Sequence, residues 1–325
     1  MSEISLDLLC IGNAIVDILA PVSHEALKAL GSPPGGMVLI DADQARGIEG
    51  GITPEQVMGG GSAANTAVVA QRLGARVGYL GKVAADEAGL HYARDLTAQG
   101  LRYPSAPVEN ADVPTARCII LVTPDGQRTM HTYLGICTDF GPEDVDAETV
   151  RSAAVTYMEG YLFDKPRAKA AFVHAAEIAH AAKRHVALTL SDSFCVGRHK
   201  ASFRQLVAGH IDILFANEDE ICALYDTTDF DAAAAQAARE TSLVVLTRSE
   251  KGAVVISGGQ RYDVPTQPVK VVDTTGAGDA FAAGFLAALA KGRDLADCAA
   301  LGNQAAGAII TRMGARPAAE FALRA

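Results

Sequence analysis

The second half of the chain alternates regularly between short apolar runs and Ala-rich helical patterns. The apolar runs, which are typical of buried strands, lie at 153–158, 185–190, 211–215 and 243–247. The helical patterns lie at 166–183, near 203–208, at 219–225 and at 231–240. Strands separated in this way predict a parallel sheet with helices on both faces. We therefore predict an α/β fold with a doubly wound, mostly parallel sheet.

Two further features complete the predicted second half. An antiparallel pair over 252–257 and 260–264 leads into a β-rich segment that ends at Val271-Val272. Two helices follow, over 277–291 and 295–312. No internal repeat or low-complexity linker divides the chain, so we expect a single domain over 1–325.

The first half contains strands that do not belong to a parallel sheet. Residues 6–13 read as a buried strand, but the strands at 116–123 and 128–134 are joined only by the turn Pro124-Asp125-Gly126-Gln127. Parallel strands need a longer crossover, so this hairpin belongs to another sheet. We expect a small β-sheet lid built from segments of about 14–22, 35–40 and 104–136. Helices are predicted at 23–30, 41–48, up to 73 and 86–99, with a strand at 76–80.

Composition excludes several classes of protein. The 325 residues are 49% hydrophobic, and the formal net charge of −10 argues against nucleic-acid binding. The six cysteines are scattered without a Cys-x-x-Cys pair, which disfavours a disulfide framework or a structural zinc site. No apolar run reaches the roughly 18 residues of a membrane span. We expect a cytoplasmic protein whose partners are small molecules, with no membrane or nucleic-acid partner.

A glycine-rich turn precedes the helix predicted over 277–291. Gly276 and Gly278 form a tight turn, and backbone N–H groups at such a helix start bind anions. Asp279 places a carboxylate inside this anion site. It is either a helix cap or a base that takes a proton from a hydroxyl while the N–H groups hold a phosphoryl group. Neither a P-loop nor a Rossmann fingerprint occurs elsewhere in the chain.

Two polar features in the first half are candidates for ligand binding. Asp17 lies in an apolar strand and faces either solvent or a ligand. The run Gly59-Gly60-Gly61 opens a helix that carries Asn65 one turn inside. It reads either as a flexible turn or as a loop that lets the backbone approach a ligand closely.

The two glycine-containing stretches together resemble the signatures of the ribokinase-like (PfkB) carbohydrate kinase family. The first is Gly60-Gly61-x-x-x-Asn65, and the second runs from Asp273 to Asp279. The resemblance covers essentially the whole chain and implies phosphoryl transfer from ATP to a substrate hydroxyl. It implies Asp279 as the catalytic base and the backbone of Gly276, Ala277 and Gly278 as the anion hole. Binding of the sugar hydroxyls is implied for Asn13, Asp17, Gly60, Gly61 and Asn65.

The resemblance also implies a nucleotide and metal side of the site. Asn217 and Glu220 would organise Mg²⁺ and the phosphates, Glu220 through water, although an acidic first helix turn is the alternative. Nucleotide contacts are implied for Thr247, Ser249 and Gly252, where many relatives have Gly in place of Ser249, and for Asn303, whose alternative is to cap a loop. A monovalent cation, K⁺ in particular, would lie near the backbone of Asp273, Thr275 and Gly314.

The hairpin and the segment around Met37 look most like the adenosine-kinase-like branch of the family. By resemblance, Arg128 would swing to the transferring phosphate, although it also reads as an exposed residue beside a turn. Met37, Leu39, Tyr161 and Leu162 are candidates for the walls of a base pocket. The expected reaction is phosphorylation of a nucleoside 5′-hydroxyl. The alternatives are a kinase of a free sugar and a non-catalytic binding protein, and the chain is expected to be a monomer or a homodimer.

Overall fold

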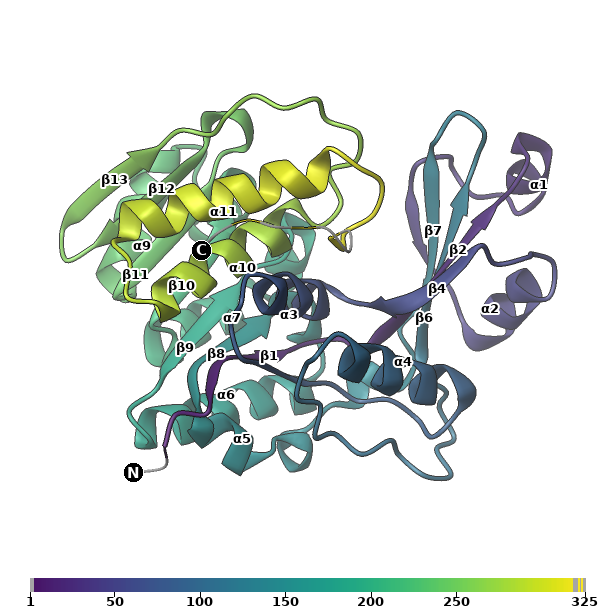
Figure 1. Ribbon diagram of the computed structural model, residues 1–325, viewed down its shortest axis with the longest axis horizontal. Coiled ribbons are helices and arrows are strands. Elements are labelled where there is room, and N and C mark those ends of the chain that lie inside the picture. Colours follow the sequence, from purple (N-terminus) through teal and green to yellow (C-terminus); the bar gives the residue numbers. More distant parts are fainter. Residues whose placement is uncertain (1–2, 318–320, 322, 324–325) are drawn as a thin grey trace.

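Two β-sheets of unequal size organise the computed structural model (Figure 1), which describes residues 3–317, 321 and 323. The large sheet has eight strands in the order β13-β12-β11-β10-β9-β8-β1-β5. Six neighbouring strands of this sheet are parallel, namely β5, β1, β8, β9, β10 and β11. The strands β12 and β13 add an antiparallel edge. Their bounds are β1 (Leu6–Ile11), β5 (Val77–Leu80), β8 (Ala153–Glu159), β9 (His185–Thr189), β10 (Ile213–Asn217), β11 (Leu243–Thr247), β12 (Ala253–Ser257) and β13 (Gln260–Val264).

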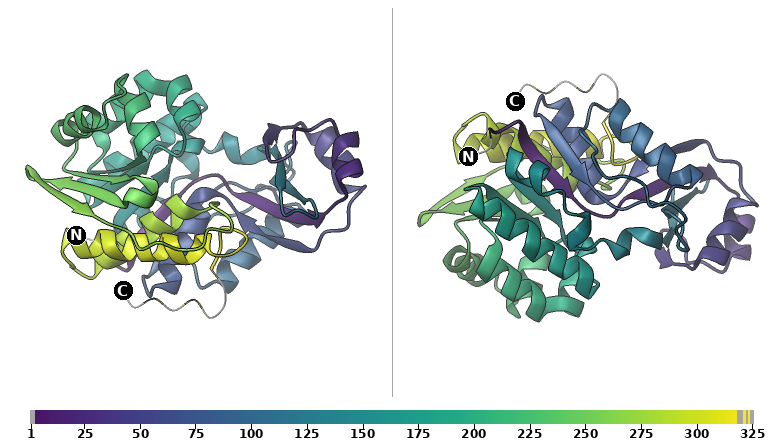
Figure 2. Two further views of the ribbon diagram at one scale, coloured as in Figure 1. Left: turned by 90° about the horizontal axis from the view of Figure 1, so that it is seen from above. Right: turned by 90° about the horizontal axis from the view of Figure 1, so that it is seen from below.

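Helices cover both faces of the large sheet (Figure 2). One face packs against α3 (Ser62–Arg72), α4 (Glu87–Ala98), α10 (Ala277–Ala290) and α11 (Leu295–Ile310). The other packs against α5 (Ala147–Ser152), α6 (Pro166–Ala181), α7 (Ser193–His210), α8 (Glu218–Tyr225) and α9 (Phe230–Glu240). Strand alternation divides the core between the faces: Leu8 and Cys10 join the first cluster, and Leu9 and Ile11 the second.

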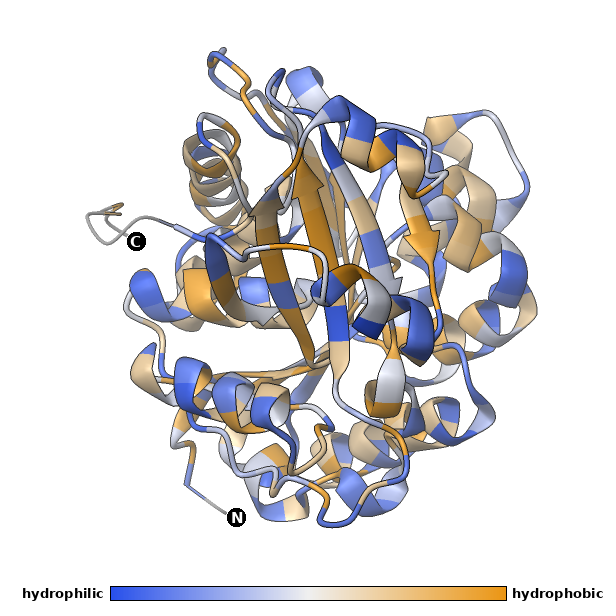
Figure 3. Cartoon of the chain, turned by 90° about the vertical axis from the view of Figure 1, so that its right-hand side faces the viewer, coloured by the Kyte–Doolittle hydropathy of each residue, from blue (hydrophilic) through white to orange (hydrophobic). Residues whose placement is uncertain are grey.

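The small sheet projects from one side of this body. Its strand order is β3-β7-β6-β2-β4, with β3 (Met37–Leu39), β7 (Arg128–Tyr133), β6 (Ala116–Val122), β2 (Ile15–Pro21) and β4 (Gln56–Gly60). Two helices, α1 (His24–Ala29) and α2 (Ala42–Glu49), cover its outer face. Ala20, Leu27, Ala45, Ile119 and Leu121 form a separate apolar cluster there. Figure 3 views the molecule from this side and shows the apolar strands behind more hydrophilic helices.

The predicted fold class is confirmed, but some predicted elements are wrong or incomplete. Residues 265–272 form no strand, because Pro265 and Pro268 lack a backbone donor and the segment instead follows α11, where Val272 N donates to Ile310 O at 2.8 Å. Helix α7 begins ten residues before the predicted 203, because Asp192 caps it by accepting from Cys195 N at 2.6 Å. The glycine-rich run before α3 ends a strand, β4, that pairs with β2.

All six cysteines are free thiols, and five of them are buried. Within the described part of the chain, no helix is both long enough and apolar enough to cross a membrane.

Candidate active site

The first turns of α3 and α10 meet at the carboxylate of Asp279. Ser62 Oγ donates to Asp279 Oδ1 at 2.6 Å, and Asn65 Nδ2 donates to Oδ2 at 3.2 Å. Both donors come from α3, whose first helical residue is Ser62. Asp279 is the third residue of α10, so the carboxylate lies at the positive ends of two helices. The structure thereby joins the two glycine-containing signatures, which are more than 200 residues apart in sequence.

Two half-buried carboxylates at this place have raised pKa values. Burial raises the pKa of Asp279 to about 6, although the hydrogen bonds from Ser62 and Asn65 oppose the shift. Burial likewise raises the pKa of Asp17 to about 6, against the positive charges of Arg316 and Arg128. A carboxylate with a pKa near 6 is a stronger base than an exposed one and is still ionised at neutral pH.

Asp17 lies against the glycine-rich end of β4. A Cβ atom at Gly60 would be 2.2 Å from Asp17 Oδ2, so only glycine leaves room for this carboxylate. At Gly61 the backbone φ is +96°, and a Cβ atom would be 2.2 Å from the carbonyl oxygen of Asn13. The glycines thus bring the end of β4 into contact with Asn13. A flexible turn, which was one interpretation of this glycine run from the sequence, does not account for this packing.

A buried glutamate that sequence reasoning missed holds these segments together. Glu159 is 1% exposed and accepts from Asn13 N at 3.3 Å, Asn13 Nδ2 at 3.1 Å and Ala63 N at 2.8 Å. Burial raises the pKa of Glu159 to about 7. Asn13 Oδ1 also accepts from Cys137 Sγ at 3.1 Å. The available signal was positional, since Glu159 ends the apolar strand β8, and ligand sites of parallel sheets lie at strand ends.

The turn before α10 presents part of the predicted anion hole. Gly276 has a φ of +77°, and a Cβ atom there would be 2.6 Å from the Cβ of Ala315. Ala277 N donates to Thr274 O at 3.2 Å and so closes the turn instead of facing a ligand. Among the described residues, the N–H groups of Gly276 and Gly278 have no backbone acceptor, and open space surrounds Gly278. Both N–H groups are therefore free to donate to an anion.

Asp273 organises the entry to this turn. Its Oδ1 accepts from Thr275 N at 2.9 Å and from Thr275 Oγ1 at 2.6 Å, and its Oδ2 accepts from Gly314 N at 2.9 Å. Arg128 Nη1 completes the set with a 2.5 Å contact to Oδ2. Since every lone pair of the Asp273 carboxylate is engaged, a cation at this place would have to bind the neighbouring backbone carbonyls.

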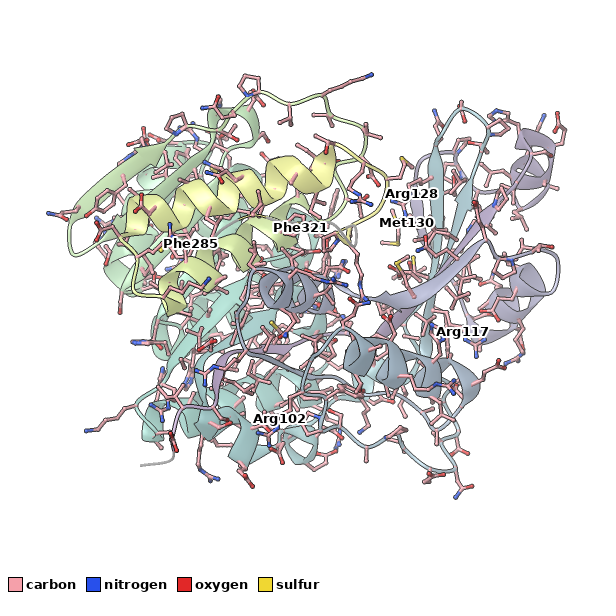
Figure 4. All side chains as sticks on the ribbon, viewed as in Figure 1. Arg102, Arg117, Arg128, Met130, Phe285 and Phe321 are labelled. Carbon is pink, nitrogen blue, oxygen red and sulfur yellow. The ribbon has the colours of Figure 1, made fainter. Side chains whose placement is uncertain are left out.

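Arg128 connects the small sheet to the body of the molecule. It begins β7, and its side chain is 12% exposed. Figure 4 shows Arg128 and Met130 extending from the small sheet toward the body, with Arg117 on the outer side. The alternative of an exposed residue beside a turn does not describe Arg128, because its guanidinium pairs with a residue of the signature turn.

Strand register places two predicted pocket residues on the same face as Asp17. Asp17 pairs with Cys118, Cys118 with Thr132, and Thr132 with Leu39, so these four side chains form one row. The next row on that face is Leu19, Ile120, Met130 and Met37. Met37 is 57% exposed and Leu39 is 60% exposed. The small sheet therefore presents uncovered apolar side chains on the same face as the Asp17 carboxylate, three strands away from it.

The other two pocket candidates differ in accessibility. Tyr161 is 42% exposed, and its backbone N donates to Ser191 Oγ at 3.2 Å. Leu162 is 1% exposed and packs in the core between the large sheet and α6. Tyr161 is thus accessible to a ligand, whereas the side chain of Leu162 is not.

Asn217 and Glu220 form a reciprocal cap at the start of α8. Asn217 Oδ1 accepts from Glu220 N at 2.8 Å, and the two carboxylate oxygens of Glu220 accept from Asn217 N at 3.0 Å and Nδ2 at 2.6 Å. Burial raises the pKa of Glu220 to about 7. In the same turn, Glu218 pairs with Arg248 at 2.9 Å. Asn217 and Glu220 therefore cap the helix, which was the alternative interpretation from the sequence. Because these hydrogen bonds engage both oxygens of Glu220, its carboxylate has little capacity left for direct metal coordination.

The remaining nucleotide candidates lie at the end of β11 and on α11. Thr247 ends β11, and the following loop contains Ser249 with a φ of +50° and Gly252 with a φ of +88°. The positive φ of Ser249 is a backbone conformation that favours glycine. Asn303 Nδ2 donates to Val264 O at 3.1 Å and to Pro265 O at 3.3 Å, which is the loop-capping alternative. Thr247 and Asn217 are register partners, so both end at the same edge of the sheet.

The chain belongs to the pfkB family of carbohydrate kinases, whose family model matches residues 52–322. It is therefore similar in sequence and fold to kinases, as the two signatures predicted. The adenosine kinase of Saccharomyces cerevisiae is 29% identical over 94% of this chain and 95% of its own length.

Solved structures of kinases are also similar to this chain. The adenosine kinase from Sinorhizobium meliloti superposes with a TM-score of 0.86 and 48% identity over 96% of each chain. A probable sugar kinase from Rhizobium etli superposes with a TM-score of 0.86 and 46% identity over 96% of this chain and 95% of that chain. These similarities confirm the predicted family and support its adenosine-kinase-like branch.

Proposed function

We propose that this protein is an ATP-dependent nucleoside kinase that phosphorylates the 5′-hydroxyl of adenosine. The observation that carries the nucleoside is the apolar face of the small sheet. Met37 and Leu39 lie more than half exposed on the same face as Asp17. Asp17 suits a ribose hydroxyl, and the exposed apolar side chains farther along the same face suit a purine, whereas a free sugar has no group to cover them.

The proposed reaction uses Asp279 as the base. Its carboxylate, with a pKa near 6, accepts the proton of the 5′-hydroxyl while that oxygen attacks the γ-phosphorus of ATP. The N–H groups of Gly276 and Gly278 hold the phosphoryl oxygens as charge moves to the leaving ADP. Arg128 releases Asp273 and donates to the transferring group when the small sheet closes as a lid. Closure also excludes water, which limits ATP hydrolysis.

Mg²⁺ and the phosphates belong near Asn217 and Glu220 in this proposal. Because the capping bonds engage both oxygens of Glu220, it acts on the metal through water, in keeping with the waters that Mg²⁺ retains. Mg²⁺ supplies neutralising charge to the phosphates. Thr247, Ser249, Gly252 and Asn303 form the nucleotide side, and K⁺ near the backbone of Asp273 and Thr275 stays a prediction.

A substrate panel tests the proposal. Purified protein with Mg²⁺-ATP is offered adenosine, other nucleosides, ribose and fructose, and ADP release is measured together with product mass. We expect adenosine to give the highest kcat/KM. Turnover with free sugars alone would support the sugar kinase instead, and no turnover with any acceptor would support a binding protein.

The pKa values predict how activity depends on pH. Asp17 and Asp279 both act as carboxylates and both titrate near pH 6. Log kcat/KM should therefore be flat above pH 7 and approach a slope of two below pH 6, which is about a hundredfold loss per pH unit. A profile that stays flat to pH 5 would contradict these assignments.

Unfolding does not explain this acid loss. The folded-state pKa values of both aspartates lie above the ordinary value of about 3.9, so the folded protein binds protons more tightly than the unfolded chain. Their contribution to the free energy of unfolding therefore increases as the pH falls from 7 toward 4. At pH 5.5, circular dichroism should show a folded protein. The ADP-release assay at the same pH should show low activity.

Arg128 and Arg117 make a matched pair of lid arginines. Both lie on the small sheet in ion pairs, Arg128 with Asp273 and Arg117 with Glu49. Arg128→Met should lower kcat about a thousandfold, the low end for an arginine that stabilises a phosphoryl transition state. Arg117→Met, on the outer side, should keep kcat within about threefold. Equal effects in the two variants would indicate a general weakening of the small sheet.

A further inference from the structure

We propose that Arg316, which follows the last helix, is a positioning residue of the active site, an inference that rests on the kinase function proposed above. It acts in two ways: it holds the amide of Asn65 in the orientation that serves Asp279, and it supplies positive charge to Asp17. Sequence patterns do not single it out, because it lies in an irregular segment without a motif.

The guanidinium of Arg316 is anchored between segments that form the acceptor site. Its Nη1 lies 2.7 Å from Asp95 Oδ2, and the side chain is only 11% exposed. Asp95 Oδ2 also accepts from Gly59 N at 3.0 Å, beside the glycines that contact Asp17. Asp95 lies on α4 and Gly59 on β4, so one cation fixes the C-terminal segment to both elements.

The contact with Asn65 gives the side-chain amide a defined direction. Arg316 Nε donates to Asn65 Oδ1 at 3.4 Å, while Asn65 Nδ2 donates to Asp279 Oδ2 at 3.2 Å. In the flipped orientation the amide oxygen would face the carboxylate and the NH₂ group would face the guanidinium. Both contacts would be repulsive, because a guanidinium only donates and a carboxylate only accepts. Arg316 and Asp279 therefore select the same orientation from opposite sides.

Arg316 also acts on the second carboxylate of the site. The charged groups that shift the pKa of Asp17 are Arg316 from the C-terminal segment and Arg128 from β7. The Cys118 thiol of β6 is the register partner of Asp17, and the Asp17 carboxylate raises the pKa of this thiol. The two arginines lower the pKa of Asp17, and Arg316 has the larger effect of the two. Arg316 thus favours the ionised form of Asp17, which is the form that accepts hydrogen bonds from substrate hydroxyls.

The remaining nitrogen of the guanidinium argues against a purely structural role. Within the described residues, Arg316 Nη2 is buried and has no hydrogen-bond partner. A buried donor without a partner costs about 1–3 kcal/mol, so the site is not arranged for stability alone.

The test separates charge from geometry with two substitutions and a matched control. Arg316→Met removes the charge and keeps the length, and Arg316→Lys keeps the charge without the planar fork. The control is Arg76→Met, which breaks an arginine–aspartate pair with Asp7. Asp7 lies near the start of β1, whereas Asn13 of the acceptor site follows the other end of this strand. The readouts are the pKa of Asp17, measured by NMR on the substrate-free protein with labelled aspartate, and the separate values of kcat and KM.

We expect Arg316→Met to raise the pKa of Asp17 by at least about half a unit and to lower kcat about tenfold. The acid limb of kcat/KM should move to higher pH by about half of the pKa change, because Asp279 titrates in the same limb. Arg316→Lys should keep the pKa of Asp17 and still lower kcat, because the amide of Asn65 loses its directing donor. Arg76→Met should match the wild type in all readouts. An unchanged pKa and unchanged kcat in Arg316→Met would overturn the inference.

Asp95→Asn provides a second route if Arg316→Met is poorly folded. It releases the guanidinium but retains its charge, so kcat should fall while the pKa of Asp17 does not rise. Wild-type kcat in both Asp95→Asn and Arg316→Lys would overturn the orienting role. Failure of the proposed function is distinguishable, because it would appear as an inactive wild type in the substrate panel, whereas the titration of Asp17 needs no substrate.

Discussion

Asp279→Asn is expected to lower kcat by about 10²–10⁴-fold while adenosine still binds with a Kd within about fivefold of the wild type. General-base catalysis contributes about 10²–10⁴ in rate, and the anion hole left behind holds the phosphoryl group without removing the proton. Coupled ADP release measures kcat, and calorimetry measures binding. More than a tenth of the wild-type kcat would remove Asp279 from the role of base.

The neighbouring helix supplies a control for this substitution. Asp297 is the third residue of α11, as Asp279 is of α10, and it is exposed. Asp297→Asn removes the same charge at an equivalent helix position, so it reports the effect on the helix dipole alone, and kcat should not change. The melting temperature of Asp279→Asn should equal or exceed that of the wild type, because a carboxylate with a raised pKa is destabilised by burial.

Gly60→Ala is expected to raise the KM for the acceptor about a hundredfold. The new Cβ would lie 2.2–2.4 Å from the carboxylate atoms of Asp17, so the carboxylate must leave its position. A displacement of about 1 Å at a binding group can cost that factor in rate or affinity. Initial rates over a range of adenosine concentrations measure KM, and ATP binding should be retained because the nucleotide candidates lie on other elements.

Gly209→Ala is the control for Gly60→Ala. Gly209 lies on α7, and no atom would come within 4 Å of its Cβ. This variant should keep its KM and gain up to about 1 kcal/mol in free energy of unfolding from better helix propensity. A wild-type KM in Gly60→Ala would mean that Asp17 does not bind the acceptor.

Local patterns predicted the fold and one half of the site. The alternation after residue 153 reflects burial of each strand between helices, and the turn from Asp273 to Asp279 is a contiguous motif, so both can be read along the chain. The strand at Gln56–Gly60 was missed because its glycines resemble a loop until β2 pairs with it.

The other half of the site depends on contacts between distant residues. Glu159 meets Asn13 across 146 residues, and Arg316 meets Asn65 across 251 residues. Neither side chain has a neighbour in sequence that reveals its partner. For Asn303 the sequence allowed two interpretations, a residue of the nucleotide pocket or a cap on a neighbouring loop. The hydrogen bonds from its amide to Val264 O and Pro265 O show that it caps the loop.

The chain passes between the two sheets at places that also carry the residues proposed to bind the acceptor. It crosses from β1 to β2 through Asn13, and from β4 into α3 through Gly61, and these two crossings touch each other. Any residue exchanged there to admit a different acceptor also changes the stiffness of the connection on which the small sheet turns. If the small sheet opens as the proposed lid, we expect that acceptor choice and the rate of opening cannot be altered independently at these positions. Variants selected for a new substrate should carry compensating changes elsewhere in the small sheet.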